Sequence, residues 1–253
     1  MPKHELSHNR FNLCLAKKIF FFILVMLALL LTPYQLSWVS ATSLYLFHPG
    51  FGSPTIDGNV ETSEWAAADT YTHVMVGSDT GLEGTLYVLQ DQDNLYLGFI
   101  IDDDELTIGN WYGLLGDTLE IDFDDNNSGS LYEVGENKVI IDAVTPYYDK
   151  HFDNTSGGSD DDAQQDGHGY LTRQGNDNHF ELAFPLCSGD AEDFCLTDGS
   201  ILGLQIQYND YDTNTAVPNP APDGSKFPGQ EAYELVTIEI LTIYDIFLPI
   251  ISK

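Results

Sequence analysis

The sequence is poor in positive charge. Its 253 residues include 9 Lys and Arg against 40 Asp and Glu, which gives a formal net charge of −31 at pH 7. A surface of this sign repels phosphate backbones and anionic lipid headgroups, so nucleic acids and membrane surfaces are unfavourable partners. Cations remain as natural partners, although a solvated acidic surface without a specific site explains the same charge.

Cysteine is also scarce, with three in the chain. Cys187 and Cys195 lie eight residues apart, and we predict a disulfide that closes one loop, as in proteins of oxidising compartments. A metal site is the weaker interpretation, because two thiolates without a nearby histidine make a poor zinc cage.

No apolar run is long enough for a typical membrane-spanning helix. The longest, residues 19–31, follows Lys17 and Lys18 and has the length of a signal-peptide core. Val39, Ser40 and Ala41 supply small residues at the positions that a signal peptidase reads. We therefore predict cleavage after Ala41 and a secreted or cell-surface protein without a membrane anchor. An uncleaved membrane anchor is the alternative.

Helical periodicity and catalytic signatures are missing too. No nucleophile elbow, zinc-protease helix or phosphate-binding glycine loop occurs, so we expect no enzyme. Period-two alternation between turn residues instead predicts an all-β, antiparallel two-sheet β-sandwich of jelly-roll type. The predicted strands are Thr85–Leu89, Leu95–Ile101, Thr118–Phe123, Lys138–Val144, His179–Phe184, Ile201–Tyr208 and Tyr233–Leu241.

Three other segments are predicted outside this pattern. Glu64–Ala68 is expected to form one helical turn, the acidic residues 154–169 a surface loop, and the proline-rich residues 213–229 a stiff segment that is not a strand. The apolar tail 244–253 is either a sorting element or an extra edge strand.

Four segments together resemble carbohydrate-binding module family 9 and its DOMON-like relatives. They are PTIDGNVETSEW (54–65), the hairpin at 84–101, GDTLEIDFD (116–124) and GSILGLQIQYND (199–210). The resemblance covers about residues 54–240. It implies one domain of a sugar-binding type. Together with the leader and the tail described above, we predict a signal peptide at 1–41, this domain at 42–243 and the tail at 244–253.

The resemblance also implies a sugar site. Trp111 stands where the family places an aromatic platform, Glu120 where it places a hydroxyl acceptor, and Lys138 near a basic sugar contact. Gln207 and Asn209 alternate outward on a late strand, as Gln205 does, and offer paired donors and acceptors. The family's second tryptophan is missing, which leaves Phe227 or Tyr233 as the other wall, whereas Trp65 stands where the family buries a tryptophan in the sandwich.

The sequence contains a calcium-type ligand pattern. Oxygen-bearing side chains recur at alternate positions and a glutamate stands in the twelfth place: Asp122, Asp124, Asn126, Ser128 and Glu133. The sixth place holds Asn127 instead of glycine, but asparagine tolerates the left-handed conformation. The acidic runs 102–105 and 160–162 are alternative cation sites, and the resemblance implies structural calcium as the cofactor.

We therefore expect an exported, calcium-stabilised, non-catalytic module that binds a polysaccharide or oligosaccharide and works alone or with a separate glycoside hydrolase. Two alternatives remain open. One is a haem-binding DOMON-like electron-transfer domain that uses Met75 with a histidine or lysine, since His73 and Met75 lie close together. The other is a structural surface domain that has lost its sugar site.

Overall fold

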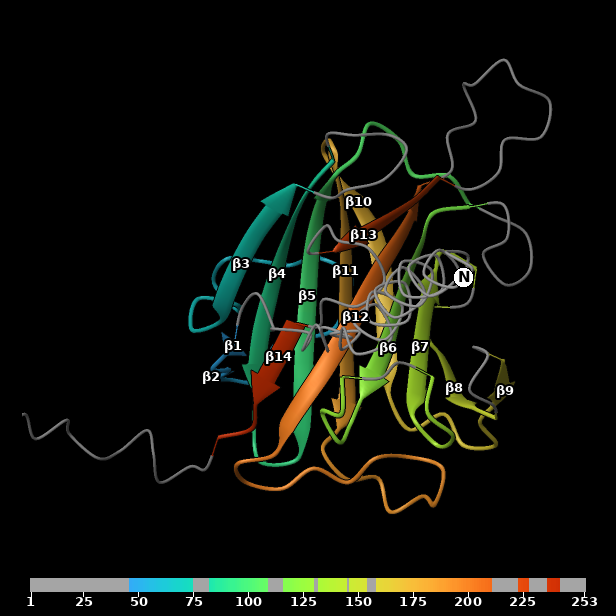
Figure 1. The fold of residues 1–253 in the computed structure, drawn as a ribbon. Coiled ribbons are helices and arrows are strands. Elements are labelled where there is room, and N and C mark those ends of the chain that lie inside the picture. The colour runs from blue at the N-terminus through green and yellow to red at the C-terminus, as the bar shows by residue number, and fades with distance from the viewer. Residues whose placement is uncertain are drawn as a thin grey trace, which may run out of the picture. The chain divides into compact units, whose positions relative to one another are not determined.

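Two β-sheets form the described part of the chain (Figure 1). The computed structural model describes residues 46–74, 82–108, 116–129, 132–144, 146–153, 158–210, 223–227 and 236–241, and these residues contain no helix. Accordingly, no described segment is a helix with the length and apolarity needed to span a membrane.

The first sheet has eight strands in the order β1-β14-β12-β6-β7-β8-β9, with β13 paired to β12. Its strands are β1 (Leu46–Phe47), β6 (Thr118–Asp124), β7 (Asn137–Asp142), β8 (Tyr148–Phe152), β9 (Ser159–Asp161), β12 (Ile201–Asp210), β13 (Asp223–Phe227) and β14 (Val236–Glu239).

The second sheet has six strands in the order β10-β11-β5-β4-β2, with β3 paired to β4. Its strands are β2 (Gly50–Phe51), β3 (Asp69–Val74), β4 (Glu83–Gln90), β5 (Asn94–Asp102), β10 (His168–Gln174) and β11 (Asp177–Pro185).

Alternate residues of both sheets meet in one apolar core. Phe99 of β5, Ile121 of β6 and Phe180 of β11 belong to the same buried cluster. Because side chains alternate along a strand, Glu120 and its even-numbered neighbours on β6 face away from this core. The all-β two-sheet sandwich is therefore confirmed, and its pairings are antiparallel except for β1 with β14 and β2 with β4.

Trp65 is buried as predicted, with 2% of its surface exposed, but it does not lie between the sheets. It packs with Leu89, Tyr96 and Ala183, which face the outer side of the six-stranded sheet. Gly98 leaves room for the ring, since a Cβ atom there would stand 3.1 Å from it. The tryptophan thus closes a second, smaller core on the outside of this sheet.

Several predicted segments differ from the structure. The proline-rich segment 213–229 was predicted to hold no strand, but it contains β13, and the predicted loop 154–169 contains β9 and the start of β10. The segment Glu64–Ala68 forms turns and not a helix: the N–H groups of Glu64 and Trp65 both donate to the Glu61 carbonyl, and the Ala68 N–H donates to the Trp65 carbonyl, each at 3.0 Å. The tail 244–253 lies outside the described residues.

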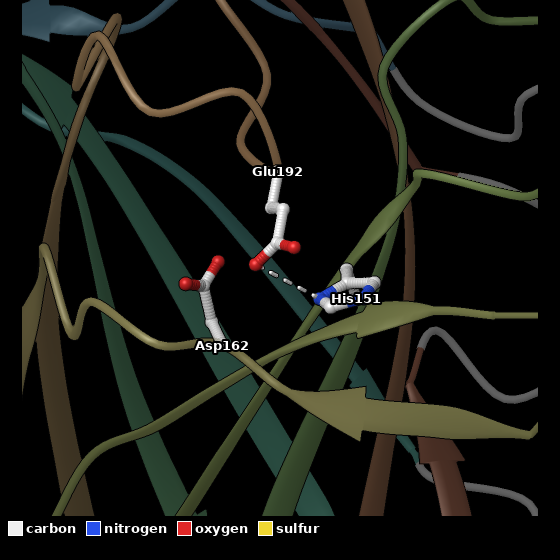
Figure 2. A group of neighbouring side chains, drawn as sticks. All are labelled: His151, Asp162 and Glu192. Atoms are coloured by element: carbon white, nitrogen blue, oxygen red, sulfur yellow. Dashed lines mark ion pairs between the residues drawn. The ribbon is translucent and has the colours of Figure 1, made fainter.

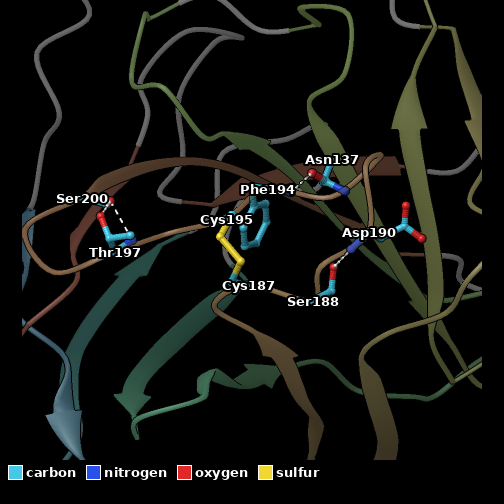
Figure 3. Close-up of a disulfide and its surroundings, with 8 residues drawn as sticks. All are labelled: Asn137, Cys187, Ser188, Asp190, Phe194, Cys195, Thr197 and Ser200. Carbon is cyan, nitrogen blue, oxygen red and sulfur yellow. Dashed lines mark hydrogen bonds between the residues drawn. A yellow bond between two sulfur atoms is a disulfide. The ribbon is translucent and has the colours of Figure 1, made fainter.

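The predicted disulfide is present. Cys187 and Cys195 close a loop between β11 and β12 (Figure 3). Asn137 of β7 fastens this loop: its side-chain amide donates to Asp193 Oδ1 at 2.9 Å, and its Oδ1 accepts the Phe194 N–H at 3.1 Å. The disulfide loop (187–195) is therefore held at the end of β7 as well as by its own covalent link.

Candidate functional site

Four of the predicted sugar-binding residues share the outer face of the eight-stranded sheet. Gln207 of β12 pairs directly with Glu120 of β6, and Asn209 pairs with Thr118. Lys138 of β7 pairs with Asp122 of β6. Since paired residues of an antiparallel ladder lie on one face, Glu120, Lys138, Gln207 and Asn209 form a continuous polar surface over β7, β6 and β12.

Lys138 is the charged centre of this polar face. Its Nζ forms an ion pair with Glu120 Oε1 and lies 3.5 Å from Asp122 Oδ1. Burial works against the ammonium charge, but the carboxylates of Asp122 and Glu120 outweigh it and raise the pKa of Lys138. Lys138 consequently remains protonated as a donor throughout the physiological pH range.

The amides complete the face. Gln207 Nε2 donates to Asn209 Oδ1 at 2.7 Å, so the two amides of β12 are joined to each other. An ammonium, a carboxylate and two amides on neighbouring strands supply both donors and acceptors within a few ångströms. Such a surface can bind a neutral molecule that carries adjacent hydroxyl groups.

One aromatic residue of the same face was missed by the sequence analysis. Tyr148 of β8 pairs with Ile140 of β7, which pairs with Glu120. Its ring is partly exposed, and Lys150 Nζ lies 5.3 Å from the ring centroid. The sequence offered no signal for it, because β8 lacks apolar alternation and was not predicted as a strand.

The predicted aromatic walls are not placed by the structure. Trp111 and Tyr233 lie outside the described residues. Phe227 ends β13, where its backbone pairs with Ile206, so the chain returns beside Gln207. Of the haem alternative, His73 lies on β3 and Met75 lies outside the described residues.

The five predicted calcium ligands do not all occupy one loop. Asp122 lies on the polar face beside Lys138, whereas Asp124 closes the following turn by accepting the N–H groups of Ser128 and Gly129, both at 2.8 Å. Glu133 accepts hydrogen bonds from the side chains of Asn126 at 3.0 Å and Ser128 at 3.1 Å. Asn127 adopts the expected left-handed conformation, with φ of 50°. This ligand set stays a prediction.

A carboxylate not named in that pattern lies behind the turn. Glu136 is 2% exposed and accepts the Glu133 N–H at 2.8 Å through Oε2. Burial, with added repulsion from Asp124 and Glu133, raises the pKa of Glu136 to about 8. The turn therefore brings the carboxyl groups of Asp124, Glu133 and Glu136 close together.

A second acidic group involves the predicted alternative run 102–105. Asp103, Asp117 and Asp210 are all buried, and one carboxylate oxygen of each lies within 4.8 Å of the others. Asn178 Nδ2 donates to Asp103 Oδ2 at 3.1 Å, and the Tyr208 hydroxyl also donates to that oxygen. Burial raises the pKa of Asp103. Three buried carboxylates at this separation suit a hard divalent cation with oxygen ligands.

Comparisons with known proteins identify the family and agree with the two-sheet fold. The family described as carbohydrate family 9 binding domain-like matches residues 56–219. A carbohydrate-binding module of family 9 from Caldicellulosiruptor kristjanssonii in complex with cellotriose superposes with a TM-score of 0.58 at 16% identity, over 82% of this chain and 100% of that one. A second structure, from the same organism and in complex with glucose, gives 0.55 at 16% identity over 77% and 95% of the two chains. A search of curated proteins finds no match.

Proposed function

Because the chain belongs to the carbohydrate family 9 binding domain-like family, we propose that it binds a polysaccharide or oligosaccharide through the polar face of β6, β7 and β12. The module has no catalytic role in this proposal. Its contribution is to hold a carbohydrate at one surface by contacts that neither make nor break covalent bonds.

The observation that carries the proposal is the pairing of Gln207 with Glu120 beside the Lys138 ion pair. Adjacent sugar hydroxyls need a donor and an acceptor at neighbouring positions, and charged partners form the stronger hydrogen bonds. Here Glu120 accepts, Lys138 donates, and the Gln207 amide does both. The solved structures that resemble this chain hold cellotriose and glucose, which makes these sugars the natural first probes.

An aromatic ring would supply the apolar half of the site. The CH face of a pyranose packs on a flat ring, and we assign this role to Trp111, which precedes β6 by a few residues in the sequence. Tyr148, Phe227 and Tyr233 are the candidates for a second ring. Tyr148 is supported by its place in the same row of the sheet as Glu120.

We extend the proposal to structural calcium. The group of Asp103, Asp117 and Asp210 fits such an ion because all three carboxylates are buried and close together. Asp117 directly precedes β6 and Asp210 ends β12, and Thr118 pairs with Asn209, so both aspartates lie at the same edge of the sheet. An ion here would offset repulsion between the strands that carry the polar face.

We also propose export through the leader 1–41, with a separate glycoside hydrolase as the enzyme that benefits from binding. The disulfide of Cys187 and Cys195 supports an oxidising compartment. Intact-mass measurement of the protein recovered from its host tests this: a chain that begins at Thr42 is expected, and a mature chain that retains residues 19–31 would contradict export by cleavage.

A glycan array tests the binding function directly. Wild-type protein and Gln207→Ala are applied with calcium and after chelation. Wild type should bind a subset of glycans, and Gln207→Ala should bind the same subset more weakly, since one paired hydroxyl contact is lost. An array without any signal from folded wild-type protein would instead favour the structural domain that has lost its sugar site.

A further inference from the structure

A second group of potential ligands lies on the other side of the same sheet. It consists of His151 on β8, Asp162 directly after β9, and Glu192 in the disulfide loop (Figure 2). His151 pairs with Asn137, whereas its neighbour Lys150 pairs with Lys138 of the polar face. Alternation along β8 therefore directs His151 to the opposite face from the proposed sugar site.

The three side chains converge. One ligand atom of each, either a ring nitrogen or a carboxylate oxygen, lies within 4.8 Å of the other two. His151 Nδ1 is 3.7 Å from Glu192 Oε2, which is too long for a hydrogen bond. Figure 2 shows the Asp162 carboxylate directed toward the space next to these two groups.

Two atoms in this group are buried without a hydrogen-bond partner. Asp162 is 6% exposed, its Oδ1 accepts the Gln164 N–H at 2.9 Å, and its Oδ2 has no partner. His151 Nδ1 is also buried and without one. Buried polar atoms in folded proteins are nearly always bonded, so two such atoms facing one point indicate a missing ligand.

The charge around the group specifies the ligand's sign. Asp149 and Asp193 are further carboxyl groups near Asp162: burial, with added repulsion from Asp162, raises the pKa of each. Asp162 and Glu192 are themselves acidic, and His151 is the only basic side chain among the three residues. A cation is favoured here, and the imidazole nitrogen distinguishes the set from the all-oxygen groups that suit calcium.

We propose that His151, Asp162 and Glu192 bind a first-row divalent transition metal of the zinc type. One imidazole nitrogen and two carboxylate oxygens leave a fourth position for water, as in three-ligand zinc sites. Ligands about 2.0–2.2 Å from zinc stand roughly 3.4 Å apart, so closure needs a shift of about 1 Å. The Glu192 side chain can supply it, because that side chain is 46% exposed.

The metal would join segments that are distant in the sequence. Glu192 belongs to the disulfide loop, which Asn137 already fastens to β7. His151 and Asp162 belong to the β8 and β9 edge, where the Asp162 N–H also donates to the Asp149 carbonyl at 3.1 Å. Zinc would therefore link this edge to the loop between the two sheets, independently of the sugar site.

Titration of the exported protein with zinc chloride tests the proposal. The protein is first stripped with chelator and then saturated with calcium, so that all-oxygen sites are occupied. We expect one zinc per chain in wild type. His151→Gln and Asp162→Asn each remove a metal ligand. Loss of outer-shell support alone costs metal sites roughly 10–100-fold in affinity, so each variant should weaken zinc binding by at least that factor.

His48→Gln is the matched control. His48 Nδ1 lies 3.3 Å from Glu239 Oε2, but this pair belongs to neither ligand group found among the described residues. The control should bind zinc as wild type does. Asp162→Asn keeps the acceptor for the Gln164 N–H, so its fold should persist.

A measurement on wild type covers the case in which a variant fails to fold. The ¹⁵N resonance of His151 Nδ1 should shift on addition of one equivalent of zinc, while that of His48 stays in place. The proposal is wrong if wild type binds no zinc, if His151→Gln binds it like wild type, or if the His151 resonance does not respond.

Discussion

Trp65 donates a 2.7 Å hydrogen bond from Nε1 to Oε1 of Glu181, which joins the segment after the Asp57-Gly58 turn to β11. The other oxygen of Glu181 accepts the N–H groups of Asp57 at 2.9 Å and Gly58 at 2.8 Å. One buried carboxylate thus organises both the turn and the tryptophan that covers the outer side of the six-stranded sheet.

Trp65→Ala should destabilise the domain strongly. Removing a fully buried ring leaves a cavity over Gly98, and such substitutions cost about 3–5 kcal/mol. Urea unfolding measures the change, and Tyr170→Ala, at a side chain that is 48% exposed, is the control and should change stability by less than about 0.5 kcal/mol. A loss below about 1 kcal/mol for Trp65→Ala would show that the ring does not support this core.

Glu181→Gln should cost about 1–3 kcal/mol, because the amide accepts at one end only and leaves buried donors on the other side unpaired. Burial raises the pKa of Glu181 despite the hydrogen bonds from Asp57 and Trp65, which lower it. A carboxyl with a raised folded pKa contributes stability that is complete below its unfolded pKa and is lost as pH rises through the folded pKa.

The stability advantage of wild type over Glu181→Gln should therefore shrink as pH rises from about 4, near the unfolded pKa, toward neutral. Unfolding free energies of both proteins at several pH values test the sign. An advantage that grows with pH would mean that the hydrogen bonds outweigh burial and that the pKa of Glu181 is lowered.

The strands show how much of the fold could be predicted from the sequence. β6 alternates apolar and polar residues, so period two alone places Glu120 on the outer face and Ile121 in the core. β8 carries Asp149 and His151 where core residues would stand, so its pattern gives no strand signal. β13 lies in a proline-rich segment, and prolines argue against a strand, so β13 was not predicted.

The candidate sites also differ in how far the sequence predicts them. Glu120 and Gln207 follow from alternation on two predicted strands. The pairing of Trp65 with Glu181, and the meeting of His151 with Asp162 and Glu192, depend on register and on loop placement between segments far apart in the chain. No local pattern encodes such contacts.

Calcium should raise the melting temperature more than sodium chloride does at equal ionic strength. An ion that binds only the folded state adds about 2.7 kcal/mol at a hundredfold excess over its dissociation constant. Asp210→Asn should abolish this gain if the buried aspartate group holds the ion, whereas Glu133→Gln should abolish it if the hairpin 122–133 does. Equal stabilisation by sodium, with no effect of chelator, would show that the acidic groups are only solvated.

Trp111→Ala should abolish carbohydrate binding with little change in melting temperature, the opposite of the pattern expected for Trp65→Ala. An aromatic platform for sugar is exposed by its function, so it adds little to the core. Tryptophan fluorescence during titration with cellotriose reports binding in wild type, and thermal unfolding reports stability. If Trp111→Ala unfolds the domain while Trp65→Ala leaves it stable, the roles of the two rings have been exchanged.

Calorimetric titration of cellotriose into wild type and Glu120→Gln tests the central claim most directly. The polar face predicts binding by wild type and a loss of about 10–100-fold in Glu120→Gln, the equivalent of one charged hydrogen bond. Glu83→Gln, an exposed glutamate on β4 of the other sheet, should bind as wild type does. If Glu120→Gln remains folded and binds cellotriose with wild-type affinity, carbohydrate does not bind at the face formed by β6, β7 and β12.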